Sequence, residues 1–159
     1  MLLKNYYKMI SGQSPLVNYS GSSWDIVYWN NKWDGSTFPV VLDNPTRGSS
    51  ILLGSGDTAP TLDDYWAETP ISTLTTVSQT QNSKTPMQIR SVTRVVRNDT
   101  ENSIIVRELI YYINVFRGGS ITASNYADCA FARKVLETPV IIAPGETYAF
   151  TYIIEGGNA

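Results

Sequence analysis

Short runs of apolar residues alternate with turn-forming residues along most of the chain, and no long window shows the 3.6-residue period of an amphipathic helix. This pattern is typical of an all-β sandwich or barrel. At most two short helices are expected, near Leu3–Ile10 and Thr61–Trp66. The apolar runs predict eight strands, over Ser23–Trp29, Phe38–Leu42, Ser50–Gly54, Thr73–Gln79, Gln88–Arg97, Ile104–Val115, Ala130–Glu137 and Thr147–Ile154.

The central part of the chain predicts a hairpin over Gln88–Val115. Its two apolar strands flank Asn98–Ser103, a polar stretch that cannot pack in a core but suits a short connection. The C-terminal strand alternates large aromatic and smaller side chains, as expected for a strand buried on one face. A turn is predicted just before it at Pro144 and Gly145, because proline presets φ and glycine accepts a positive φ.

The 159 residues suit one domain, and no repeat or linker divides them. We expect a single antiparallel β-sandwich, jelly-roll-like, over residues 36–159, preceded by an N-terminal aromatic arm or hairpin over residues 1–35. Tryptophan and tyrosine act as core residues, as subunit contacts or as sugar-stacking surfaces, and we rank the three roles in that order. The interface or glycan candidates are Tyr6, Tyr7, Trp24, Tyr28, Trp29 and Trp33, with Trp66 as a further member of the sugar-stacking set.

Composition excludes several chemistries. The chain has no histidine, which rules out Ser-His-Asp and Cys-His catalysis and histidine-ligated metals. The single cysteine, Cys129, allows no intrachain disulfide and is interpreted as a small buried side chain. The formal net charge of −2 argues against a dedicated nucleic-acid surface, and no apolar run is long enough to span a membrane. Composition alone does not say what the chain does. We expect no cofactor or metal, and a neutral surface rich in serine and threonine.

A glycine-rich loop has both a functional and a structural interpretation. Gly54–Ala59 fits the dinucleotide fingerprint G-x-G-x-x-A. That chemistry needs a helix directly afterwards to present N–H groups to a pyrophosphate, and Pro60 and Pro70 bracket a segment too short for it. We interpret the loop as a glycine turn leaving a strand.

An acidic loop follows, and its carboxylates have two interpretations. Loop carboxylates are the usual ligands of calcium, although no EF-hand spacing is present. The favoured interpretation is local capping, in which Thr61 and Asp64 imitate a capping box. The other acidic residues of the cluster are Asp57, Asp63 and Glu68, and Glu68 is interpreted as a solvated turn residue.

Glu108 is predicted on an apolar strand face. By parity it shares that face with Val106 and Ile110, so burial of its carboxylate requires a partner. We expect an ion pair with an arginine on a facing strand, either Arg133 or Arg94. A hydrolase that uses paired carboxylates is a further functional alternative, but nothing in the sequence brings two carboxylates together across a cleft.

Three blocks of sequence are similar to a known class of proteins. They are ILLGSGDTAPTLDDYWAETPI over Ile51–Ile71, VVRNDTENSIIVREL over Val95–Leu109 and ARKVLETPVIIAPGETY over Ala132–Tyr148. Their order resembles that in small β-rich structural proteins encoded among the virion genes of tailed bacteriophages, particularly gut phages. The resemblance extends over Ile51–Glu155, about two-thirds of the chain.

The resemblance implies positions in a fold. A glycine-rich strand end leads to an Asp-Tyr turn, then to a hairpin whose second strand carries a glutamate, and then to an arginine-containing strand before a Pro-Gly turn. Tyr111 and Tyr112 depart from the pattern, which has a smaller, glycine-containing stretch there. The matching positions in this chain are Gly54, Gly56, Asp64, Tyr65, Glu108, Arg133, Pro144 and Gly145.

The resemblance also implies a function. We expect a non-enzymatic virion protein, made in the cytoplasm of a host bacterium, whose partners are copies of itself and other particle proteins such as the major capsid or tail proteins. A head decoration or auxiliary capsid protein, or a head-fibre base, is the leading expectation. A tail or connector component and a carbohydrate-binding module at a fibre tip are the alternatives.

Overall fold

The computed structural model describes residues 1–4, 16–17, 20–21, 23–24, 50–84, 89–116 and 126–155. These residues form an all-β structure, and within them no helix is long and apolar enough to cross a membrane. The predicted all-β class is therefore confirmed for the described part of the chain. The strands are β1 (Leu16–Val17), β2 (Ser23–Trp24), β3 (Ser50–Gly54), β4 (Thr75–Lys84), β5 (Ile89–Arg97), β6 (Ile104–Phe116), β7 (Tyr126–Ile142) and β8 (Thr147–Glu155).

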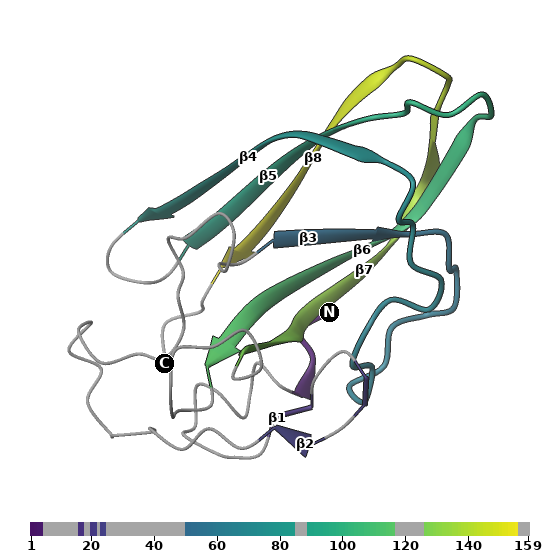
Figure 1. Cartoon of the computed structure of the whole chain (residues 1–159). Helices are drawn as coiled ribbons and strands as arrows, with labels where there is room; N and C mark the ends of the chain where they lie inside the picture. The colour runs from purple at the N-terminus through teal and green to yellow at the C-terminus, as the bar shows by residue number, and fades with distance from the viewer. Residues whose placement is uncertain are drawn as a thin grey trace.

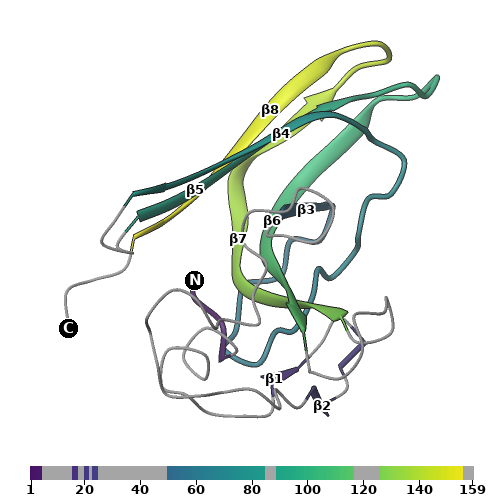
Figure 2. The same cartoon turned by 60° about the vertical axis from the view of Figure 1, so that its left-hand side comes forward.

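Two antiparallel sheets of three strands each form the body of the molecule. One has the order β3-β6-β7 and the other the order β4-β5-β8, while β1 and β2 form a separate two-stranded pair. All three connections between the larger sheets leave from one end, because the ends of β3, β5 and β7 lie there together with the starts of β4, β6 and β8. Figures 1 and 2 show the two sheets diverging from this shared corner.

The main core lies between the two sheets. It takes side chains from both, because alternate residues of each strand point to the same face. Phe131 and Ile51 are among the fully buried members from the first sheet, and Val92 and Phe150 come from the second. The remaining buried members are Leu53, Leu74, Val96, Val106, Leu109, Tyr111, Cys129, Ala132 and Ile142.

A second, smaller cluster lies apart from the main core. It is formed by Leu3, Ile110 and Ala130, against which Trp66 and the neighbouring Ala67 pack from the β3–β4 loop. Because Ile110 and Ala130 belong to β6 and β7, the first sheet is buried on two faces. The N-terminus and the β3–β4 loop supply the cover on the second face.

Strand parity along β6 changes between Val106 and Glu108, where the register with β7 shifts. Val106 belongs to the main core, whereas Ile110 belongs to the second cluster. The sequence prediction that Glu108 shares a face with Val106 is therefore wrong, because an irregularity reverses the alternation of faces. Glu108 and Ile110 share the face that the β3–β4 loop covers.

The predicted hairpin over Gln88–Val115 is also wrong. β5 pairs with β4 on one side and with β8 on the other, so it has no free edge left for β6. β6 lies in the other sheet, between β3 and β7. The polar stretch Asn98–Ser103 is thus a crossing between sheets and not a hairpin turn.

Asn98 holds this crossing in place and is fully buried. Its side-chain amide donates hydrogen bonds to the backbone carbonyls of Asn102 (2.8 Å) and Ile142 (2.9 Å). Its backbone N–H donates to the Glu146 carbonyl (2.9 Å), and its carbonyl accepts from the Gly145 N–H (2.7 Å). Asn98 therefore joins the β5–β6 crossing to the β7–β8 crossing. Gly145 has a φ of 79°, as the predicted Pro-Gly turn requires.

Strand boundaries match the sequence predictions to different degrees. β3 has the predicted bounds, and β4, β5, β6 and β8 overlap their predicted strands. β7 is longer than predicted and continues through Pro139, which lies where its register with β6 is irregular and can tolerate a residue without an N–H group. The possible helix over Thr61–Trp66 is absent: this segment contains one turn, at Leu62 and Asp63, and a bend at Trp66. The predicted strand Phe38–Leu42 and residues 5–10 of the other possible helix lie outside the described residues.

Candidate functional site

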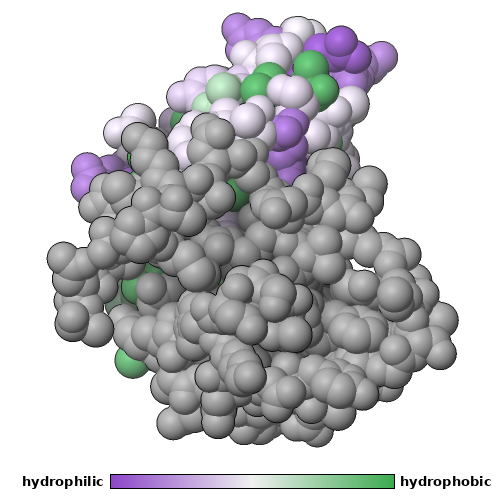
Figure 3. All heavy atoms as spheres, turned by 90° about the vertical axis from the view of Figure 1, so that its left-hand side faces the viewer, coloured by the Kyte–Doolittle hydropathy of each residue, from purple (hydrophilic) through white to green (hydrophobic). Residues whose placement is uncertain are grey.

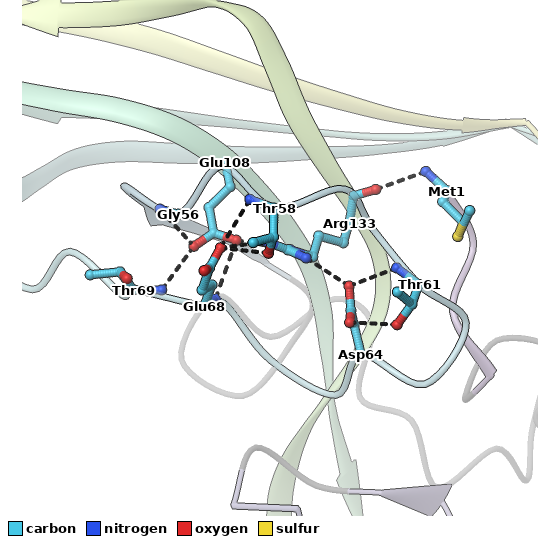
Figure 4. Close-up of polar contacts among 9 residues, drawn as sticks. All are labelled: Met1, Gly56, Thr58, Thr61, Asp64, Glu68, Thr69, Glu108 and Arg133. Atoms are coloured by element: carbon cyan, nitrogen blue, oxygen red, sulfur yellow. Dashed lines mark hydrogen bonds and ion pairs between the residues drawn. The ribbon is translucent and has the colours of Figure 1, made fainter.

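A fully buried carboxylate lies at the centre of the polar network between the first sheet and the β3–β4 loop (Figure 4). Oε1 of Glu108 accepts hydrogen bonds from the backbone N–H groups of Thr69 (3.0 Å) and Gly56 (3.3 Å). Oε2 accepts from Arg133 Nε (2.9 Å) and from the backbone N–H of Glu68 (3.3 Å). Each oxygen therefore has two donors, which compensates for the loss of water.

Arg133 distributes its guanidinium among three carboxylates. It lies diagonally across from Glu108 on the neighbouring strand, since β6 and β7 pair Glu108 with Val135. Its Nη1 donates to Asp64 Oδ2 at 2.7 Å, and its Nη2 contacts Glu68 Oε2 at 3.4 Å. Only 3% of the Arg133 side chain is exposed. One buried cation thus connects the sheet to two acidic residues of the loop.

Threonine hydroxyls and backbone amides orient the two loop carboxylates. Asp64 accepts from the N–H (3.0 Å) and the hydroxyl (2.7 Å) of Thr61, and its own N–H donates to the Thr61 carbonyl (3.3 Å). Half of the predicted capping box is therefore formed, because the Asp64 carboxylate binds the Thr61 N–H while the Asp64 N–H binds the Thr61 carbonyl and not its hydroxyl; the pair closes a turn and not a helix. Glu68 Oε2 accepts from the N–H (3.1 Å) and the hydroxyl (2.7 Å) of Thr58.

These hydrogen bonds favour the ionised carboxylates. Burial alone would raise the pKa of Asp64, but the hydrogen bonds from Thr61 and Arg133 outweigh it and hold the pKa below its ordinary value of 3.8. Hydrogen bonds from the Thr58 hydroxyl and N–H lower the pKa of Glu68 from 4.5. Burial would lower the pKa of Arg133, yet the carboxylates of Asp64 and Glu108 raise the pKa above its ordinary value. Asp64, Glu68 and Arg133 are therefore charged at neutral pH.

Two glycines make room for the buried carboxylate. Gly54 lies directly opposite Glu108 in the β3–β6 ladder, and a Cβ atom there would stand 2.6 Å from Glu108 Cγ. A Cβ atom on Gly56 would stand 2.6 Å from Cβ of Glu68 and 2.8 Å from Glu108 Oε1. Both glycines are thus required by close packing, which agrees with interpreting Gly54–Ala59 as a glycine turn leaving a strand.

A pocket of about 560 Å³, open to solvent, lies over the network. Its lining includes the charged residues Asp64, Glu68 and Arg133 and the aromatic residues Tyr65 and Trp66. Its other lining residues are Thr58, Thr61, Asp63 and Ala67. Within the described ranges, no group of three or more His, Cys, Asp or Glu side chains is arranged to hold a metal ion.

The expected ion pair between Glu108 and Arg133 is present. Arg94, the other arginine considered as a partner of Glu108, has different partners. Arg94 donates to the Ile51 carbonyl at 2.7 Å and to the Thr76 hydroxyl at 3.0 Å. Trp24 ends β2. The remaining aromatic candidates lie outside the described residues: Tyr6, Tyr7, Tyr28, Trp29 and Trp33.

Sequence reasoning missed the part that Glu68 plays. It was interpreted as a solvated turn residue, but its side chain contacts Arg133 and its backbone N–H binds Glu108. Thr58 and Glu68 are 10 residues apart in the sequence, which is further than a local capping motif spans. No short sequence motif therefore marks this pair. Asp63 forms an exposed ion pair with Lys4 at 3.0 Å.

The arrangement fits a structural role for Glu108. A catalytic carboxylate needs an oxygen that can reach a substrate, whereas both oxygens of Glu108 are saturated and 0% of the residue is exposed. Cys129 is likewise buried, and burial raises the pKa of its thiol to about 12. Comparison of the chain with protein-family models, with curated proteins and with solved structures finds no match.

We predict that Glu108 and Arg133 depend on each other for stability. Glu108→Gln and Arg133→Met should each lower the free energy of unfolding by about 3–5 kcal/mol, because each leaves a buried partner uncompensated. The double variant should lose less than the sum of the two. Urea unfolding of the four proteins measures the coupling. Additive losses would contradict a direct pair, and the matched exposed pair Arg97–Asp99 should show much weaker coupling.

We also predict that acid weakens the contact between loop and sheet. The pKa values of Asp64 and Glu68 are lower in the folded protein, so their contribution to stability is complete above the unfolded values near pH 4 and is lost as the pH falls through the folded values. Unfolding midpoints at pH 6, 4 and 3 measure this loss. Asp64→Asn should be less stable at pH 6 and should depend less on pH. Equal pH dependence of Asp64→Asn and a Glu101→Gln control would contradict the prediction.

Proposed function

We propose that this chain is a non-enzymatic structural protein of a tailed-bacteriophage particle, which joins copies of itself and other particle proteins. Within the particle we assign it to the head, as a decoration or auxiliary capsid protein or at the base of a head fibre. The alternative location is the tail or the connector.

The observation that supports this proposal is that the three resembling sequence blocks meet in one network. The block Ile51–Ile71 supplies Gly54, Gly56 and the acidic loop residues; the second block supplies Glu108, and the third supplies Arg133. Residues 51–71 lie far from residues 95–148 in the chain, yet they contact one another through hydrogen bonds. The resemblance therefore follows the positions that hold the fold together.

The described surface suits repeated contacts between copies. The outer face of the β4-β5-β8 sheet has uncharged rows, including Thr80–Thr93–Thr151 and Ser78–Val95–Ala149. The described atoms in the upper part of Figure 3, where this sheet lies, include broad white and pale purple areas, together with several strongly hydrophilic groups and small apolar areas. A surface with few charges limits the electrostatic repulsion between identical copies packed side by side.

We further propose that the two sheets form a β-sandwich of jelly-roll type. Its support is the main core, which includes Phe131 and Ile51 from the first sheet and Val92 and Phe150 from the second. A sandwich buries one face of each sheet in this way. The proposed sandwich would present the edges and outer face of the β4-β5-β8 sheet to neighbouring proteins.

A particle role predicts that the chain is a constant part of the virion. Particles of the phage whose genome encodes the chain, purified on a density gradient, should contain it at a fixed ratio to the major capsid protein by quantitative mass spectrometry. Heads separated from tails should retain it. Detection only in the soluble lysate would contradict the particle role, and retention by isolated tails alone would move the protein to the alternative location.

Carbohydrate binding is a second candidate function, favoured by the pocket over the network. Tyr65 and Trp66 add aromatic rings to the lining, and the Asp64 and Glu68 carboxylates offer acceptors for hydroxyl groups. Of the sugar-stacking set that the sequence suggests, Trp66 lines this pocket.

A glycan array tests the second candidate directly. Binding by the native chain should be lost in Tyr65→Ala and kept in Tyr148→Ala. The two tyrosines are a matched pair, since 45% and 43% of their surfaces are exposed. Absence of binding across the array, or equal loss in both variants, would contradict a sugar site in this pocket.

A further inference from the structure

The outer edges of the β3-β6-β7 sheet are covered by other parts of the chain. At β7, the N–H groups of Leu3 and Arg133 bond to the carbonyls of Phe131 and Met1 at 2.8 and 2.9 Å. At β3, the N–H groups of Ser55 and Ile71 bond to the carbonyls of Thr69 and Leu53 at 2.9 and 2.8 Å. Such covering prevents an edge strand from pairing with another chain.

The edges of the β4-β5-β8 sheet differ. Among the described residues, no segment pairs with the outer side of β4 or β8. β4 is irregular between Thr76 and Ser78, and irregularities of this kind discourage pairing. β8 keeps a regular register with β5 along all nine residues, and Thr147–Ile154 contains neither a charged residue nor a proline. β8 therefore lacks the usual protections of an edge strand.

We propose that β8 joins two copies of this chain. The two β8 strands would pair antiparallel about a two-fold axis at Thr151, so that two three-stranded sheets become one continuous sheet. In an antiparallel ladder about every second residue directs its N–H and C=O groups outward, and these groups would find partners in the second copy. The inference rests on the proposed function, in which copies of the chain associate, and it assigns this association to the outer edge of β8.

The side chains of β8 suit pairing with a second copy of themselves. About an axis at Thr151, Ala149 lies opposite Ile153 of the other copy on the outer face, so a small side chain meets a large one. On the inner face Phe150 lies opposite Tyr152, which gives an aromatic cross-strand pair. No like charges meet over Ala149–Ile153. Ile153, which is 55% exposed, would lose contact with water.

Adding one charge to the strand tests the proposal. The native chain should form a dimer in sedimentation velocity, and Thr151→Lys should weaken it by roughly a hundredfold or more, because the axis places two lysines together. Thr80→Lys is the matched control, since Thr80 is exposed, lies in the same row of the sheet and belongs to the other edge. A monomeric native chain, or equal loss of the dimer in both variants, would overturn the proposal.

A cysteine at the axis gives a second measurement that does not depend on a destabilising charge. Oxidised Thr151→Cys should form a covalent dimer, whereas the native chain should not, because its Cys129 is buried. Thr80→Cys should form no covalent dimer under the same oxidant; cross-linking there in place of Thr151→Cys would overturn the assignment to β8. Hydrogen exchange should show the β8 amides protected in the native dimer and more exposed in Thr151→Lys. Protection in a monomer would mean that the chain itself covers this edge.

The two proposals fail in different ways. A monomeric chain that is still found in purified particles would contradict the β8 contact and leave the virion role intact. A β8-linked dimer that is absent from particles would support the contact and contradict the virion role.

Discussion

A carboxylate removed from water is stable only when several donors surround it, and this requirement organises the first sheet and the loop above it. Glu108 obtains its donors from β7 and from backbone N–H groups on both sides of the β3–β4 loop. The loop therefore cannot leave the sheet without exposing a charge that has lost its partners. Arg133 extends the same constraint to Asp64 and Glu68, and its backbone carbonyl accepts from the Met1 ammonium at 2.7 Å.

Such a network need not make the fold more stable than an apolar contact would. Apolar residues of similar volume can replace a buried ion pair without loss of stability, so the pair is weak evidence for a more stable fold. Its requirements are directional, however. Both oxygens of Glu108 must meet donors, and Gly54 and Gly56 must leave the space open. These directional requirements restrict the position of the loop more than apolar contacts would, because apolar contacts have no preferred direction.

Features of the fold that depend on neighbouring residues could be predicted from the sequence, whereas those that depend on residues far apart in the chain could not. Local features were accessible: the bounds of β3, the turn at Gly145 and the reciprocal bonds of Thr61 and Asp64 all depend on neighbours in the chain. The sequence limits the possible partners of Glu108 to two arginines, one of which is the observed partner. The reasoning assumed a regular alternation of side chains along β6, and this alternation is interrupted between Val106 and Glu108. Sheet membership of β5 and β6 was inaccessible, because a polar connection of this length suits a hairpin and a crossing equally well.

The corner where all the inter-sheet connections gather has a mechanical consequence. Force that pulls the far ends of the two sheets apart would act with leverage on the corner, where the bonds of Asn98 would be stressed a few at a time. Force along the strands would instead be shared among many ladder bonds at once. Resistance to rupture should therefore depend on direction, and an assembly under internal pressure would gain most from aligning the strands with the pull.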